Sequence, residues 1–337
     1  MLKYIANIQV NNPDAKRHQY DTPRFPKAQR EVTKQDGLKL LLDTDGPEAV
    51  KEWVLGQKKL LITDTTMRDA HQSLLSTRLR TRDMLKGADG TADILADCFS
   101  LEMWGGATFD TAYRFLHESP WERLEMLREK IPNIPFQMLL RGSNLVGYAS
   151  YPDNLVRAFI AESAREGIDV FRVFDSLNWM PNMETAMDEV LRQGKFLEGT
   201  VCYTGDILDP TRDRYTLEYY VNFAKELERR GAHMLAIKDM SGLLKPYAAK
   251  KLVSTLKQEI GIPIHLHTHN TSGTGDSETA INTRELLEGQ LTAMYNYMKG
   301  DLQTYWYQLT TLAEARADNA YGGNMAETKV VSVESNH

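Results

Sequence analysis

Leu60-Leu61-Ile62-Thr63 is the first of seven short apolar runs whose regular spacing decides the fold class of this chain. The later runs are Phe99-Ser100-Leu101-Glu102-Met103, Phe136-Gln137-Met138-Leu139-Leu140, Val170-Phe171-Arg172-Val173-Phe174, Gly199-Thr200-Val201-Cys202-Tyr203, Met234-Leu235-Ala236-Ile237-Lys238 and Ile262-Pro263-Ile264-His265-Leu266. Successive runs begin 28 to 39 residues apart. This spacing predicts an α/β fold of the TIM (β/α)₈ barrel type. An open doubly wound sheet is the alternative, but no glycine-rich dinucleotide fingerprint follows the first run.

The segments between the runs have helical periodicity. One helix is expected to open near Thr216 and stop at Gly231, and another to run from Pro246 to Ile260. An eighth unit is not evident, because the chain becomes polar and helical after Gly275. The only late strand candidate is 328–333. The barrel therefore closes on that strand, on a partner, or not at all.

Three regions are predicted along the chain: a connector over 1–50, a barrel over 51–275 and a mostly helical tail over 276–337. The net charge of −6 gives no electrostatic footprint for nucleic acid. No apolar run is long enough to cross a bilayer, and the N-terminal stretch is no signal peptide. Two cysteines, Cys98 and Cys202, are too few for a disulfide framework, so a reducing, cytoplasmic compartment is expected.

A set of possible metal ligands is divided between two distant segments. Asp69 follows the first run, and His265, His267 and His269 alternate around the end of the seventh. Side chains two apart on a strand share a face, so His267 and His269 can reach one ion together. A lone strand histidine is more often an ordinary core or surface residue. Three in alternation, with a carboxylate, favour a divalent metal such as zinc, manganese or cobalt.

Other polar residues follow the predicted strands, where barrel enzymes place their working groups. Asp110 follows the second strand, Arg141 the third, Asp175 the fourth, and Lys238 ends the sixth. An inward Lys238 beside a cation would be repelled and poorly solvated. It can lose its proton, react with CO₂ to form an anionic carbamate that ligates metal, or pair with the adjacent Asp239 or another carboxylate of the mouth. These alternatives stay open at the level of the residues.

Two arginines can bind an oxyanion. The guanidinium groups of Arg68 and Arg141 match a small carboxylate or an enolate oxygen, although both can equally form salt bridges at the barrel rim. Gln72 and Tyr148 can donate hydrogen bonds to the same oxygen. The residues alone predict a metal and oxyanion site at the mouth of a barrel.

Several long motifs, in this order, resemble the carboxyltransferase domain of the pyruvate carboxylase family. The motifs are Asp64-Thr65-Thr66-Met67-Arg68-Asp69-Ala70-His71-Gln72-Ser73, Leu101-Glu102-Met103-Trp104-Gly105-Gly106-Ala107-Thr108-Phe109-Asp110, Phe136-Gln137-Met138-Leu139-Leu140-Arg141-Gly142-Ser143-Asn144, Val173-Phe174-Asp175-Ser176-Leu177-Asn178, Tyr203-Thr204-Gly205-Asp206-Ile207 and Ile237-Lys238-Asp239-Met240-Ser241-Gly242-Leu243-Leu244-Lys245-Pro246. The resemblance covers residues 1–275. It is highly specific, because long motifs recur at family-like spacing.

The resemblance implies the transfer of CO₂ from carboxybiotin to the enolate of pyruvate, which forms oxaloacetate. It implies a metal held by four ligands: Asp69, His267, His269 and a carbamylated Lys238. Substrate contacts would come from Arg68, Gln72, Arg141 and Tyr148, with Asp110 close to the biotin entrance. Arg68, Gln72 and Lys238 would be the catalytic group.

The resemblance also implies partners. A biotin carboxyl carrier domain, an ATP-using biotin carboxylase domain and a homo-oligomer are expected, in the cytoplasm or, in a eukaryote, in the mitochondrial matrix. The segment Lys3-Tyr4-Ile5-Ala6-Asn7 looks like the family's interdomain connector. It favours this family over oxaloacetate decarboxylase or transcarboxylase subunits, which are the alternative.

Two features depart from the family pattern. Asn270 stands where the family has Asp, so the charge that would orient a ligating histidine is missing. After Gly275, the last barrel strand and the following helical domain are not recognisable. Three interpretations follow: a functional carboxyltransferase with a divergent end, a truncated barrel that binds metal with little turnover, or a non-catalytic barrel that serves assembly.

Overall fold

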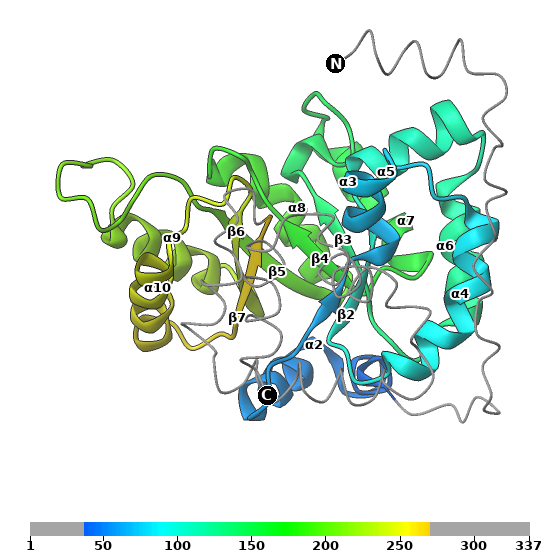
Figure 1. The fold of residues 1–337 in the computed structure, drawn as a ribbon, viewed down its shortest axis with the longest axis horizontal. Coiled ribbons are helices and arrows are strands. Elements are labelled where there is room, and N and C mark those ends of the chain that lie inside the picture. The colour runs from blue at the N-terminus through cyan, green and yellow to red at the C-terminus, as the bar shows by residue number, and fades with distance from the viewer. Residues whose placement is uncertain (1–36, 270–337) are drawn as a thin grey trace, which may run out of the picture.

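The computed structural model describes residues 37–269, and these form a curled parallel β-sheet surrounded by helices (Figure 1). The strands are β1 (Thr63–Asp64), β2 (Ser100–Trp104), β3 (Phe136–Leu140), β4 (Val170–Val173), β5 (Phe196–Cys202), β6 (Met234–Asp239) and β7 (Ile264–Thr268). Each strand pairs in parallel with the next, in the order β1 to β7. The predicted α/β barrel fold with seven recognisable strands is confirmed, and the open doubly wound alternative is excluded by this sequential order.

The helices lie outside the sheet, between successive strands (Figure 1). They are α3 (His71–Leu74), α4 (Thr81–Ile94), α5 (Gly106–Thr111), α6 (Pro120–Lys130), α7 (Asp153–Arg165), α8 (Met180–Arg192), α9 (Leu217–Arg229) and α10 (Pro246–Glu259). The Thr216 side chain accepts a hydrogen bond from Tyr219 N and caps α9, and Pro246 opens α10. Both helix starts agree with the sequence prediction, because capping residues and Pro act locally.

The two faces of the sheet differ in character. Outward residues such as Leu101, Met138 and Phe171 belong to one large apolar core that the helices cover. The inward residues of the same strands include buried polar groups: Ser100, Glu102, Gln137, Arg172 and Glu198. Strand β5 begins at Phe196, before the predicted Gly199. The apolar run in the sequence stops at the charged Glu198, but Glu198 is an inward residue of the same strand.

Helix α2 (Leu38–Gly56) lies across the end of the sheet where the strands begin (Figure 1). Leu38, Leu42 and Val50 pack there in one cluster, against residues that begin or precede the strands. These strand residues are Phe99, Val170, Phe196 and Met234. The helix bends at Gly46, which has a positive φ of 83°, followed by Pro47. It also crosses residue 50, where the sequence predicts the end of the connector.

Some sequence predictions lie outside the described residues. They concern residues 1–36 of the connector, the tail over 276–337, the strand candidate over 328–333, and Asn270. Among the described helices, none combines the length and the apolar character that a bilayer crossing requires.

Candidate metal and oxyanion site

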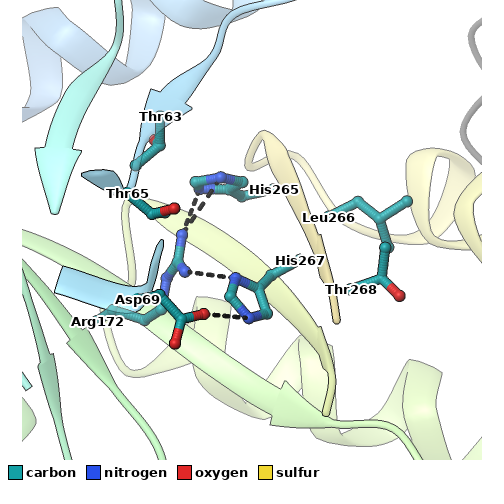
Figure 2. Close-up of a pocket in the computed structure, with 8 residues that line it drawn as sticks. All are labelled: Thr63, Thr65, Asp69, Arg172, His265, Leu266, His267 and Thr268. Atoms are coloured by element: carbon teal, nitrogen blue, oxygen red, sulfur yellow. Dashed lines mark hydrogen bonds and ion pairs between the residues drawn. The ribbon is translucent and has the colours of Figure 1, made fainter. Parts of the chain in front are cut away.

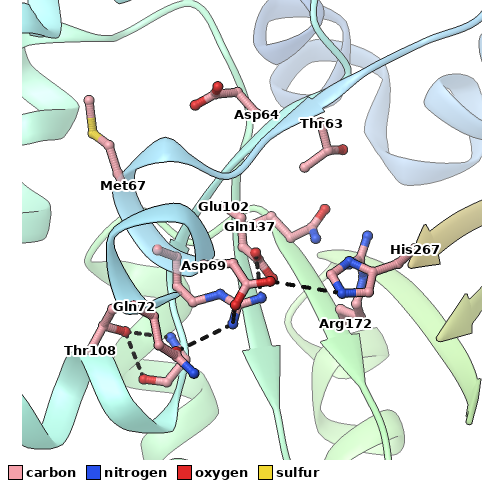
Figure 3. A network of polar contacts seen from close by, with 12 residues as sticks. Thr63, Asp64, Met67, Asp69, Gln72, Glu102, Thr108, Gln137, Arg172 and His267 are labelled. Atoms are coloured by element: carbon pink, nitrogen blue, oxygen red, sulfur yellow. Dashed lines mark hydrogen bonds and ion pairs between the residues drawn. The ribbon is translucent and has the colours of Figure 1, made fainter. Parts of the chain in front are cut away.

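The first part of the site is a tight turn directly after β1. A π-helical segment, η1 (Thr66–Ala70), carries Arg68 and Asp69 into the barrel mouth. Arg68 is buried, and its guanidinium donates to Asp69 Oδ1 (2.8 Å) and to Glu102 Oε2 on β2 (2.6 Å). Gln72 Oε1 lies 3.5 Å from Arg68 Nη1. Figure 3 shows Asp69, Gln72 and Glu102 close together below β1. The turn therefore fixes the direction of the Asp69 carboxylate.

The second part comes from β7 and brings the two distant segments together. His267 Nε2 lies 3.9 Å and His269 Nε2 3.4 Å from the same oxygen, Asp69 Oδ2. One ligand atom from each of these three residues lies within 4.8 Å of the others. His267 Nε2 is buried and has no hydrogen-bond partner among the described residues. One carboxylate, two imidazoles and an orphaned ring nitrogen form a donor set that fits a divalent cation.

The charge states of these groups also fit a cation. Burial lowers the pKa of His267, and the nearby Arg172 and Lys238 charges lower it further, so its imidazole is neutral. Burial alone would raise the pKa of Asp69. The hydrogen bond from His269 and the charge of Arg68 outweigh that effect and hold the pKa below its usual range. An ionised carboxylate and a neutral imidazole are the forms that bind metals.

Lys238 lies beside His267, since the two are register partners on β6 and β7. Its side chain is buried, with Nζ 5.5 Å from the centre of the Phe174 ring. Burial, aided by the charge of Arg68, lowers the pKa of Lys238 to about 8. The Asp239 carboxylate accepts hydrogen bonds from Leu243 N (2.9 Å) and Leu244 N (3.0 Å). Asp239 is thus engaged with its own loop, and the described residues show no ion pair between Lys238 and Asp239.

Two consecutive glycines make room for the two arginines. A Cβ at Gly105 would lie 3.1 Å from Arg68 Cδ, and a Cβ at Gly106 would lie 2.8 Å from Arg141 Cζ. The Arg141 guanidinium donates to Gly147 O (3.1 Å). Gly105 and Gly106 lie where β2 passes into α5. Their role is steric, because any side chain at Gly106 would displace Arg141.

The outer rim of the mouth holds Tyr148 and Asp110. Tyr148 is 71% exposed, and its hydroxyl lies 3.5 Å from Asp110 Oδ2. Asp110 also pairs with Arg114 Nε at 2.9 Å. Arg141 Cζ lies 5.4 Å from the centre of the Tyr148 ring, which connects the rim to the interior. The structure thus places Arg141, Tyr148 and Asp110 in one neighbourhood, outside the group of Asp69 and the histidines.

Asp175 follows β4, where the sequence predicts a working group of the mouth, but its carboxylate is bound within its own loop. Its Oδ1 accepts hydrogen bonds from Leu177 N and Trp179 N, and its Oδ2 accepts one from Asn182 Nδ2. The carboxylate therefore orders the loop after β4 and is not free to face the mouth.

Sequence reasoning missed a buried polar layer beneath the candidate ligands. Arg172 and Glu198 contact one another and the third histidine, His265. Figure 2 shows the contact between Arg172 and His265. A cavity of about 240 Å³ lies beside them, between β1 and β7. Its lining residues are Thr63, Thr65, Asp69, Arg172, His265, Leu266, His267 and Thr268. The available signal was a charged residue at an inward position inside an otherwise apolar run, as in Val170-Phe171-Arg172-Val173.

Known proteins resemble this chain over most of its length. Pyruvate carboxylase of Staphylococcus aureus is 58% identical over 280 residues, which cover 81% of this chain. Mitochondrial pyruvate carboxylase of Homo sapiens is 49% identical over 287 residues, or 82% of this chain. The solved carboxyl transferase domain of Rhizobium etli pyruvate carboxylase, with pyruvate and biocytin, is 50% identical. It aligns with a TM-score of 0.76 and covers 83% of this chain and 48% of that one.

The similarity is confined to one part of these relatives. This chain spans 24% of the length of both the bacterial and the human protein. No protein-family model matches the sequence. The comparison with the solved domain and the parallel barrel observed here agree on the same architecture.

Proposed function

Since this chain belongs to the pyruvate carboxylase family, in the segment that corresponds to the carboxyltransferase domain, we propose that it transfers a carboxyl group to pyruvate. The donor is carboxybiotin and the product is oxaloacetate. One observation carries the proposal: Asp69, His267 and His269 converge at the mouth of a barrel that also holds Lys238 and two arginines. The solved R. etli domain, which contains pyruvate and biocytin, supports the choice of substrates.

The metal would be held by Asp69, His267, His269 and a carbamate on Lys238. Zinc, manganese and cobalt all suit this mixture of oxygen and nitrogen donors. When bound, a divalent cation supplies Lewis-acid stabilisation to a developing enolate oxygen. The lowered pKa of Lys238 supports the carbamate, because the neutral amine is the form that reacts with CO₂.

The arginines have different parts in this proposal. Arg68 already binds Asp69 and Glu102, so it orients the metal ligand and offers its remaining donor capacity to the substrate. Arg141 donates to a single backbone carbonyl among the described residues and is the better clamp for the pyruvate carboxylate. Gln72 and Tyr148 would complete the oxyanion contacts from the inner and outer sides.

The chemistry is a balanced exchange of a proton and CO₂. The N–C bond of carboxybiotin breaks to release CO₂, and the biotin nitrogen takes up the methyl proton that pyruvate loses. The enolate electron pair then forms a carbon–carbon bond to the CO₂. The charged groups of the mouth favour the enolate because they are fixed before the reaction.

Other components would complete the enzyme. Carboxybiotin would arrive on a carrier domain past Asp110, after an ATP-dependent biotin carboxylase domain has charged it. We propose a homo-oligomer and a cytoplasmic location, or the mitochondrial matrix in a eukaryote. Two buried free thiols, Cys98 and Cys202, support a reducing compartment.

The test measures metal content and oxaloacetate decarboxylation with free biotin, which is the reverse partial reaction. We expect about one divalent metal per chain, lost in Asp69→Ala, and turnover that Lys238→Ala abolishes. Lys245→Ala is the matched control, because Lys245 is an exposed lysine paired with Asp206 on a neighbouring loop. A wild-type chain without metal would refute the site. Metal without turnover would favour the non-catalytic barrel.

A further inference from the structure

A buried ion pair lies directly beneath the candidate metal ligands. Arg172 on β4 and Glu198 on β5 are register partners on adjacent strands, and both side chains point into the barrel. Arg172 Nε donates to Glu198 Oε2 at 2.8 Å, and Arg172 Nη2 lies 3.3 Å from Oε1. The side chains are 1% and 0% exposed. The pair is therefore fully removed from water.

This ion pair touches the histidine strand. Arg172 Nη1 lies 3.4 Å from His267 Nδ1, and Arg172 Nη2 lies 2.8 Å from His265 Nδ1. Glu198 Oε1 lies 2.7 Å from the same His265 nitrogen. In Figure 2, Arg172 lies between His265 and His267, and Asp69 approaches His267 at its other ring nitrogen. The guanidinium thus lies against the edge of the imidazole that faces away from the candidate metal position.

Stability alone does not account for such a pair. A buried ion pair is commonly no more stabilising than an apolar pair of the same size, because two charges must be desolvated. A guanidinium beside a metal ligand also repels a divalent cation, and that repulsion is strong in a medium of low dielectric constant. The Glu198 carboxylate, bound to the same guanidinium, cancels this charge.

We propose that Glu198, through Arg172, is a positioning residue of the metal site. It neutralises the guanidinium beside His267, so that Asp69, His267 and His269 can accept a divalent cation. This assignment rests on the metal site of the proposed function and adds a layer of residues to it. The effect of the Glu198 charge on metal affinity can be measured separately from the contribution of Glu198 to folding.

The test is a titration of the full chain with Co²⁺, whose visible absorption reports bound ligands. Glu198→Gln keeps the shape but leaves Arg172 uncompensated, and we expect the Co²⁺ affinity to fall about 10- to 100-fold. The double variant Arg172→Gln with Glu198→Gln removes both charges. We expect it to recover most of that loss, which a merely structural role would not produce.

Asp169→Asn is the matched control. Asp169 is also buried and pairs with Arg128 at 2.6 Å, but it precedes β4 at the opposite end of the sheet. The Asp169→Asn variant should have a lower melting temperature and a Co²⁺ affinity within about twofold of wild type. A charge at the opposite end of the sheet interacts only weakly with a cation at the mouth. Circular dichroism would verify that each variant is folded.

The outcomes separate two failures. A wild-type chain that binds no Co²⁺ overturns the proposed metal site and this assignment with it. If the wild-type chain binds Co²⁺, two results overturn this assignment alone. One is a Co²⁺ affinity of Glu198→Gln within about twofold of wild type, and the other is a double variant that binds Co²⁺ no better than Glu198→Gln. If Glu198→Gln does not fold, Glu198→Asp replaces it: the shorter carboxylate should weaken Co²⁺ binding measurably, and an unchanged affinity overturns the assignment.

Discussion

At the scale of single residues, the barrel interior is a balance of charges. Within the described chain, three cationic side chains beside or beneath the candidate ligands face three acidic ones: Arg68, Arg172 and Lys238 against Asp69, Glu102 and Glu198. A divalent cation adds two positive charges, and conversion of the Lys238 ammonium into a carbamate removes two. Metal binding and carbamate formation, when both occur, therefore leave the net charge of these groups unchanged. Either event alone would change this net charge.

The pKa of Lys238 gives a prediction in pH. Burial lowers this pKa from 10.5 to about 8, so the neutral amine is present at lower pH than for an ordinary lysine. At a fixed concentration of dissolved ¹³CO₂, the initial rate of carbamate formation should rise with pH with a midpoint near 8. Carbon-13 NMR measures this rate. The signal should be absent in Lys238→Ala and kept in Lys245→Ala, and a midpoint near 10.5 would contradict the prediction.

At the scale of elements, α4 depends on a cap that is distant in sequence. Its own N-cap residue, Arg80, makes no side-chain cap hydrogen bond. The Glu118 carboxylate, which precedes α6, accepts hydrogen bonds from Thr81 N (3.0 Å) and Thr81 Oγ1 (2.7 Å). It also pairs with Arg123 Nη2 at 2.8 Å. One carboxylate thus joins the starts of two neighbouring helices, where a negative charge also complements the helix dipole.

Replacement of Glu118 by Gln should lower the free energy of unfolding by about 1–3 kcal/mol at pH 7, the cost of unpaired donors. Burial raises the pKa of Glu118, but the bonds from Thr81 and the arginines prevail and lower it from 4.5 to about 2. The stabilisation is therefore fully present above 4.5 and is lost as the pH falls through about 2.

Urea unfolding at several pH values measures the difference between wild type and Glu118→Gln. The difference should shrink steadily below pH 4.5. Glu162→Gln is the control, because Glu162 forms an exposed pair with Arg165 and should change stability less. A difference that is independent of pH would show that the carboxylate charge of Glu118 does not stabilise α4.

At the scale of the whole molecule, the two ends of the barrel are built differently. The end where the strands begin is sealed by the apolar side chains of α2. The end where the strands finish carries the ionisable groups of the candidate site. Stability and chemistry are thus separated, which is the usual division in barrels of this kind.

This division predicts that a charge under α2 unfolds the chain. Val50 is 2% exposed, and Val50→Asp buries an unpaired carboxylate, which should cost about 3 kcal/mol or more. Leu55→Asp on the same helix is the control, since Leu55 is 46% exposed and its replacement should be tolerated. Thermal unfolding compares the two. Equal melting temperatures would mean that α2 does not seal the barrel.

The sequence by itself determined the number and order of the described strands, the starts of α9 and α10, and the grouping of His267 with His269. These features depend on local periodicity and capping, which the chain carries without reference to distant residues. Sequence reasoning could not find the Arg172–Glu198 layer, the trans cap by Glu118, or the engagement of Asp175 and Asp239 with their own loops.

Only the tertiary structure decided those pairings. Arg172 and Glu198 meet because β4 and β5 are in one particular register, and Asp69 meets His269 because the sheet curls until its first and last strands approach each other. Register and curl depend on the packing of all strands and helices together. Buried charges gain their partners only through that packing, which is why the sequence predicted the ligands but not the layer that supports them.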